Sequence, residues 1–383
     1  SPPARPPGSP DRADPLALPP LRPISTMSDT IDRPWVGSRP GRGLGPLLMA
    51  AFLCACGAAD APDHGRMPHT TWEAAFSSLG AVELEENDDV VNAYPRVAVD
   101  PRGGYLVADM YEHQARRYAE DGRLLFRFGR EGSGPGEFVN PTAIARVASG
   151  EILVADMWGR ISVFDSTGDA FLRSKQAVHT AVLQDIDLLD DTLAVLSTGP
   201  RPGEPRLHLW DLRRDTTVAA FFVPYVAERN LPAAAAMSWT SAAIRGDTIA
   251  ATFSLSDTVY LFDRSGREVE RIPLPNGRLT SIDDVPTNYR PGDGVAALSR
   301  WLSAVDAVRK IEWLADGTFI VEYVSGSDET FHSSLLGMTR QGRLIFALED
   351  TPRLLATTPD GKVIFQSPSS DLPNHWSIVR PRW

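Results

Sequence analysis

Cysteine is almost absent from the 383-residue chain, which has only Cys54 and Cys56. Residues 57–383 therefore contain no thiol, so a disulfide-stapled scaffold is excluded there and a folded body must be held together by its hydrophobic core. The chain is 43% hydrophobic and 23% charged, which is ordinary for a globular protein. This composition excludes collagen-like, coiled-coil and wholly disordered chains.

Positive charge is also in deficit, since 38 Lys and Arg stand against 49 Asp and Glu, a formal net charge of -11. The phosphate backbone of nucleic acids attracts clustered Lys and Arg, so we expect no nucleic-acid partner. The seven histidines show no metal-ligand spacing, and a Gly-x-Ser-x-Gly motif is missing. We therefore assign no catalytic residue, metal ligand or cofactor, and a nucleophile-type hydrolase has no support.

The N-terminal stretch is dense in proline. Residues 1–46 contain twelve prolines and no hydrophobic periodicity, so we expect no folded domain there. The first methionine is Met27. We treat residues 1–26 as a disordered leader extension that takes no part in the fold.

A lipoprotein signal peptide is predicted over 27–55. An arginine-containing segment, 33–42, precedes an apolar run, 44–53, that is of signal-peptide length and too short to cross a bilayer. The following Leu53-Cys-Ala-Cys-Gly57 resembles the lipobox of bacterial lipoproteins, with Cys56 at the position that is acylated. The resemblance implies a lipid anchor in the cell envelope, with the outer membrane as the expected location. The alternative is a cleaved secretory signal with a cysteine nearby by chance.

The rest of the chain is built from repeats. Leu-Val-Ala-Asp-Met units begin at 106 and 153, a period of 47, and each is followed by an alternating strand, a turn and a further strand. Weaker copies of this strand-turn pattern begin near 185, 242, 311 and 354. Four short antiparallel strands per period of about 40 to 50 residues are typical of a propeller blade.

Six copies predict an all-β fold, a six-bladed β-propeller over 76–383, preceded by a tether over 56–75. The sixth copy has no room for a fourth strand before Trp383. We therefore predict that Ala81-Val-Glu-Leu84 closes the ring beside it, because closure protects strand edges that an open array would expose.

The second copy carries a family resemblance. Phe128-Gly-Arg-Glu-Gly-Ser-Gly-Pro-Gly-Glu-Phe-Val-Asn-Pro141, followed by Ile152-Leu-Val-Ala-Asp156 and Val163-Phe-Asp165, is similar to an NHL repeat of six-bladed propellers. The similarity spans about 96 to 173, and only the strand-turn skeleton continues beyond it. The Asn that NHL repeats carry before His or Arg is absent from the strand-connecting loops, so inherited binding chemistry is not implied.

Two short features have alternative explanations. The glycine-rich loop 129–136 could cradle a phosphate, but it lacks the Lys and the strand-to-helix context of a P-loop, which favours a turn between blades. Asp109 and Asp156 each follow a strand, where a carboxylate commonly caps a turn. For these two residues we favour a structural turn over a metal or catalytic role.

Two long connections between blades are predicted, 224–240 and 275–309, both on one face of the ring. The second contains apolar residues at helical spacing after Asp293, which predicts a short amphipathic helix. Long loops on a rigid face commonly carry binding, although these insertions could equally cover apolar edges. The polar and aromatic residues that we expect near this face are Arg130, Glu137, Tyr225, Arg229, Asn230, Trp239, Tyr289, Arg290 and Trp301.

The function that this organisation favours is recognition. We expect a monomeric, membrane-anchored lipoprotein that binds a peptide, glycan or protein partner without catalysis, because a rigid ring presents loops well. Some six-bladed propellers are enzymes, so the alternative is a metal-dependent lactonase- or lyase-type enzyme with a cation at the channel mouth. A third option is a purely structural envelope component.

Overall fold

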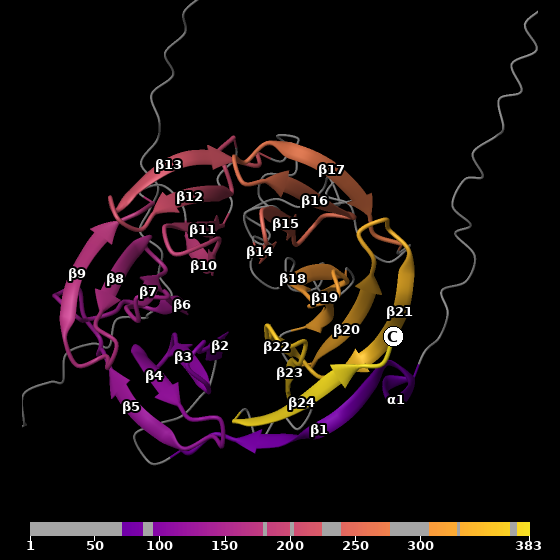
Figure 1. Ribbon diagram of the computed structural model, residues 1–383, viewed down its shortest axis with the longest axis horizontal. Helices are drawn as coiled ribbons and strands as arrows, with labels where there is room; N and C mark the ends of the chain where they lie inside the picture. The colour runs from indigo at the N-terminus through magenta and orange to yellow at the C-terminus, as the bar shows by residue number, and fades with distance from the viewer. Residues whose placement is uncertain are drawn as a thin grey trace, which may run out of the picture. The chain divides into compact units, whose positions relative to one another are not determined.

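The computed structural model describes residues 71–86, 95–178, 182–199, 203–223, 239–275, 306–327, 330–367 and 374–383 of the chain. These residues form six four-stranded antiparallel sheets arranged in a ring, with one short helix, α1 (Trp72–Ala75) (Figure 1). None of the helical structure in the described part is long and apolar enough to cross a membrane. The predicted six-bladed β-propeller is confirmed. The predicted insertion helix lies outside the described residues.

Each blade has four strands, and in blades 1 to 5 they follow the chain from the innermost strand outward. Blade 1 is β2 (Pro95–Val99), β3 (Tyr105–Asp109), β4 (Gln114–Tyr118) and β5 (Leu124–Phe128). Blade 2 is β6 (Pro141–Arg146), β7 (Ile152–Asp156), β8 (Arg160–Phe164) and β9 (Phe171–Gln176). Blade 3 is β10 (Leu183–Leu188), β11 (Leu193–Thr198), β12 (Leu207–Asp211) and β13 (Thr216–Phe221). Blade 4 is β14 (Thr240–Arg245), β15 (Thr248–Phe253), β16 (Thr258–Asp263) and β17 (Glu268–Pro273). Blade 5 is β18 (Ala307–Trp313), β19 (Phe319–Ser327), β20 (Thr330–Met338) and β21 (Leu344–Thr351).

Blade 6 combines the two ends of the described chain. It contains β22 (Leu354–Thr357), β23 (Val363–Gln366) and β24 (His375–Pro381), and its outermost strand is β1 (Phe76–Glu83), which pairs antiparallel with β24 (Figure 1). The predicted closing strand is thus confirmed, and it begins five residues earlier than the Ala81 expected from the sequence. The pairing covers the edge of β24 and gives blade 6 four strands like the other blades.

Helix α1 lies within the last residues of the segment predicted as a tether. Thr71 caps it by accepting a hydrogen bond from the Ala74 amide, and the Trp72 ring packs 5.0 Å from that of Phe365 in blade 6. Aromatic packing gives these residues a place in the folded body, so the body starts a few residues before the predicted boundary at 76.

The repeated Leu-Val-Ala-Asp sequences form the second strands of blades 1 and 2. All five residues of β3 and all five of β7 are buried. Neighbouring blades cover both faces of these strands, which explains a continuous apolar run instead of an alternating one. The outermost strand β13 alternates between exposed and partly buried residues, because only one of its faces meets the core.

A buried charge network joins blades 1 and 2. Asp100 follows β2, and its side chain is fully buried. The Asp100 carboxylate accepts a hydrogen bond from Arg117 Nε at 2.6 Å and lies 3.0 Å from Arg146 Nε in blade 2. Two guanidinium groups from different blades therefore share one carboxylate, which fixes the blades relative to each other.

Candidate functional site

One end of the ring carries the connections between successive blades. Each connection leads from the outermost strand of one blade to the innermost strand of the next. Strands within a blade alternate in direction, so the strand ends that lead into these connections lie at the same end, as do the turns between second and third strands. The long connections β13 to β14 and β17 to β18 begin and finish here. We call this end the insertion face.

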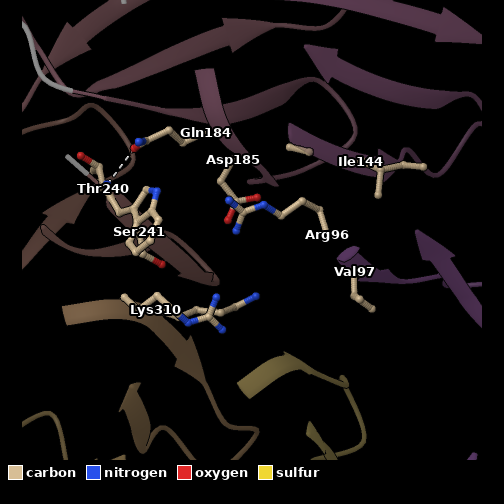
Figure 2. Close-up of a pocket in the computed structure, with 11 residues that line it drawn as sticks. Arg96, Val97, Ile144, Gln184, Asp185, Thr240, Ser241 and Lys310 are labelled. Atoms are coloured by element: carbon tan, nitrogen blue, oxygen red, sulfur yellow. Dashed lines mark hydrogen bonds between the residues drawn. The ribbon is translucent and has the colours of Figure 1, made fainter. Parts of the chain in front are cut away.

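A small cavity lies at the axis of the ring, between the innermost strands of five blades (Figure 2). Its volume is about 50 Å³, and Trp239, the residue before β14, is on its wall. Most of the strand residues on the wall lie in the first half of their strands, which places the cavity toward the insertion-face end of the channel. The polar ones are Arg96 of β2, Gln184 and Asp185 of β10, Thr240 and Ser241 of β14, and Arg309 and Lys310 of β18.

The cations contributed by β18 have acidic partners. Arg309 Nε donates to Glu322 at 2.7 Å, and Glu322 is fully buried in blade 5. Lys310 Nζ lies 3.0 Å from Glu312 and donates to the Leu355 carbonyl at 2.5 Å. These contacts hold both side chains in place across the junction of blades 5 and 6.

Asp187, two residues further along β10 than Asp185, has an unusual carboxyl group. Its Oδ2 atom is buried and has no hydrogen-bond partner among the described residues. Burial raises the pKa of Asp187 well above its ordinary value, and the charges of Asp185 and Glu312 add to the effect while Lys310 opposes it. Burial therefore disfavours the ionised carboxylate of Asp187 relative to its neutral form.

Arg206, the residue before β12, is a buried cation behind the cavity wall. It is 3% exposed, donates from Nη1 to Thr240 Oγ1 at 3.2 Å, and its guanidinium lies 4.8 Å from the Phe253 ring centroid. No carboxylate among the described residues pairs with it. Burial lowers the pKa of Arg206 to about 10, so it still carries its charge at neutral pH.

Two aromatic side chains are exposed on the insertion face at equivalent positions of blades 1 and 2. Tyr111 is 64% exposed and Trp158 is 61% exposed. Each stands two residues after the aspartate that ends the second strand. The Asp109 Oδ1 atom accepts a hydrogen bond from the Tyr111 amide at 2.9 Å, and the Asp156 Oδ1 atom accepts one from the Trp158 amide at 3.1 Å. The carboxylates thus fix the turns that display the rings.

The glycine-rich loop is the connection from blade 1 to blade 2, as predicted. Glu137 accepts hydrogen bonds from the Gly134 amide at 2.8 Å and from Arg130 Nη2 at 2.8 Å, and these contacts lower the pKa of Glu137. Arg160 of β8 donates to the carbonyls of Ser133 and Glu137 and pairs with Asp156 at 3.0 Å. The loop is therefore tied to the base of the Trp158 turn.

The structure describes three of the nine residues predicted for this face. Arg130, Glu137 and Trp239 all lie on it, with Arg130 and Glu137 in contact and Trp239 at the cavity. The other six predicted residues lie outside the described residues, together with the lipidation candidate Cys56: Tyr225, Arg229, Asn230, Tyr289, Arg290 and Trp301.

Sequence reasoning missed the exposed aromatic pair and the charged residues at the channel. The signal for Tyr111 and Trp158 was available, because each stands at the same distance from the aspartate of a repeated Leu-Val-Ala-Asp-Met unit. Arg309 and Lys310 gave no such signal, because their convergence with β10 and β14 depends on ring closure. No group of three or more His, Cys, Asp or Glu placed to hold a metal occurs within the described ranges.

Comparison with known proteins gives matches by structure and none by sequence. No protein-family model and no curated protein matches the chain. A member of the DUF4221 family from Bacteroides vulgatus matches with a TM-score of 0.57 and 11% identity, over 80% of this chain and 97% of that chain. A candidate exported protein from Bacteroides fragilis matches with a TM-score of 0.56 and 12% identity, over 82% of this chain and 98% of that one. This chain shares their fold. At such low identity the likeness extends to the fold alone.

Proposed function

We propose that the chain is an exported, lipid-anchored protein of the bacterial cell envelope that recognises a peptide or protein partner on the insertion face without catalysis. Cys56 is the proposed lipid attachment site. The sequence pattern of 27–55 supports export, and so does the name of the Bacteroides fragilis protein that shares the fold. The similarity of residues 96–173 to NHL repeats remains a prediction within this proposal.

The observation that carries the proposal is the exposed pair Tyr111 and Trp158. Trp, Tyr and Arg are the residues most enriched at energetic hot spots of protein interfaces, and Arg130 lies exposed in the adjoining loop. A covered aromatic side chain loses about 150–250 Å² of surface, and roughly 60% of that is open here, so covering each ring contributes roughly 2–4 kcal/mol.

Rigidity is the second argument for recognition. The two rings stand on turns held by aspartate carboxylates, and the two turns are connected through Asn140. The Asn140 backbone amide donates to His113 Nδ1 in the first turn at 3.3 Å. The Asn140 backbone carbonyl accepts from the Met157 amide in the second turn at 3.0 Å. A surface that is ordered before binding loses little conformational entropy when a partner arrives.

A binding screen tests the proposal. The full chain and a Tyr111→Ala/Trp158→Ala variant are applied to peptide and glycan arrays. The control is a Leu172→Ala/Val218→Ala variant, which removes two side chains of 47% and 48% exposure from the outermost strands β9 and β13. We expect peptides that are bound by the wild type and the control and lost by the aromatic variant.

Three outcomes contradict the proposal. If all three proteins bind the same peptides equally, the binding surface is not the one that carries Tyr111 and Trp158. If the only ligands found are glycans, the partner is a glycan and not a peptide or protein. A stoichiometric divalent ion whose removal by chelator lowers the melting temperature favours the metal-dependent lactonase or lyase alternative.

A further inference from the structure

The wall of the channel cavity presents hydrogen-bond donors. Thr240 Oγ1 accepts from Arg206 Nη1 at 3.2 Å, and Ser241 Oγ accepts from the Ile311 amide at 3.1 Å. A hydroxyl that accepts an N–H bond still has its own proton to donate. Both side chains are buried, at 3% and 6% exposure, and neither hydroxyl donates to another described residue. Both also line the cavity.

The charged residues on the cavity wall are largely balanced by acidic partners. The wall carries the cations Arg96, Arg309 and Lys310 and a single carboxylate, Asp185. Figure 2 shows Arg96, Asp185 and Lys310 extending from different strands into the channel. Arg309 and Lys310 have their own acidic partners, so the wall by itself leaves no large excess of charge.

Among the described residues, the charge without an acidic partner is that of Arg206, which contacts Thr240. A buried cation without a carboxylate partner is costly, and an anion nearby relieves that cost. The Arg206 guanidinium is linked to the cavity through Thr240, whose hydroxyl accepts its hydrogen bond and still has a proton to donate. One missing negative charge and two available O–H donors therefore meet at one cavity.

Size selects among anions. At roughly 10–15 Å³ per water-sized group, a cavity of about 50 Å³ holds about three to five non-hydrogen atoms. A carboxylate has the right size and carries one negative charge, whereas a phosphate group carries about −1.5 to −2 at neutral pH. One charge is what neutralises Arg206.

We infer that this cavity is a binding site for a carboxylate group, held by the hydroxyls of Thr240 and Ser241 and by the charge of Arg206. The inference deepens the proposed function and rests on it for one source of the carboxylate, the C-terminus of a peptide. A small free carboxylic acid is the other source.

Saturation-transfer NMR and calorimetric titration of the full chain test the site directly. The probes are acetate, N-acetylalanine, N-acetylalanine amide and inorganic phosphate. We expect acetate to bind and the amide not to bind. Tighter binding of N-acetylalanine than of acetate identifies the peptide C-terminus as the source, and acetate binding without N-acetylalanine binding identifies a small free acid.

Two charge variants and one control make the test specific. Gln184→Glu keeps the oxygen that accepts the Thr240 amide hydrogen bond and adds a negative charge to the wall, so acetate affinity should fall at least about tenfold. Asp185→Asn removes the wall carboxylate, so affinity should rise by about fivefold or more. Gln341→Glu makes the same charge change in an exposed turn at the opposite end of the ring and should leave affinity unchanged.

Absence of acetate binding, or equal affinity in all these variants, overturns the inference. Tighter binding of phosphate than of acetate also overturns it. Acetate binding depends on the cavity and array binding depends on Tyr111 and Trp158, so the two proposals fail independently. Asp185→Asn keeps the test decisive if Gln184→Glu does not fold, because it removes charge without adding any.

Discussion

Packing between blades 6 and 1 completes the ring, and Trp376 belongs to the hydrophobic cluster that joins these two blades. This side chain, on β24, is fully buried, and its ring stands edge-on to Tyr105 of blade 1 with centroids 5.1 Å apart. Truncation to alanine deletes the largest fully buried side chain of the described residues. Trp→Ala changes at such sites cost about 3–5 kcal/mol, of which the aromatic pair contributes roughly 0.5–1.5 kcal/mol.

Guanidinium unfolding of Trp376→Ala measures this cost. Total stabilities of about 5–15 kcal/mol are usual, so the variant should lose a large share of its free energy of unfolding. Trp158→Ala is the matched control, because its ring is 61% exposed and the same truncation should change stability by less than about 0.5 kcal/mol. Equal effects of the two substitutions would refute the packing argument for ring closure.

Three further substitutions test the fold and the channel. Gly104→Ala places a methyl group against the Tyr118 carbonyl at a backbone φ of +87°, whereas Gly246→Ala, at φ +56°, places one in open space. In thermal unfolding, Gly104→Ala should therefore destabilise the protein by about 1 kcal/mol or more relative to Gly246→Ala. Asp100→Asn leaves the buried Arg146 and the partly buried Arg117 without their shared negative charge. The substitution should cost about 3–5 kcal/mol in denaturant titration, and an unchanged free energy of unfolding would rule out the network. Because the folded-state pKa of Asp187 is raised, its ionisation destabilises the native state as pH rises above the ordinary carboxyl range. Asp187→Asn should therefore match the wild type near pH 3 and be more stable at pH 7 to 8, and a stability difference that does not change with pH would contradict this.

Much of the ring could be predicted from the sequence, because each blade is a local repeat. The Leu-Val-Ala-Asp units predicted β3 and β7 where the structure has them, and the shortage of residues after the sixth copy predicted the partner of β24. The start of β1 was placed late, because the pairing of Phe76 with Pro381 depends on a contact between chain ends that local patterns do not encode.

The site was less predictable, since it depends on convergence. Ser241 and Lys310 lie far apart in sequence and come to one cavity only because their strands are innermost in adjacent blades. The sequence does not show that Arg206 is buried, nor that it has no acidic partner among the described residues; both follow only from the folded structure. The exposed rings of Tyr111 and Trp158 could have been found by comparing the residues two places after each repeated aspartate.

The most direct test of recognition on the insertion face compares how tightly the wild type and two variants bind the highest-affinity peptide from the array. Calorimetric titration compares the full wild-type chain, Tyr111→Ala/Trp158→Ala and the outer-strand control Leu172→Ala/Val218→Ala. Loss of roughly 2 kcal/mol or more of contact energy predicts at least about a thirtyfold weaker affinity for the aromatic variant. The control should match the wild type. An aromatic variant that binds as tightly as the wild type would contradict recognition through this face.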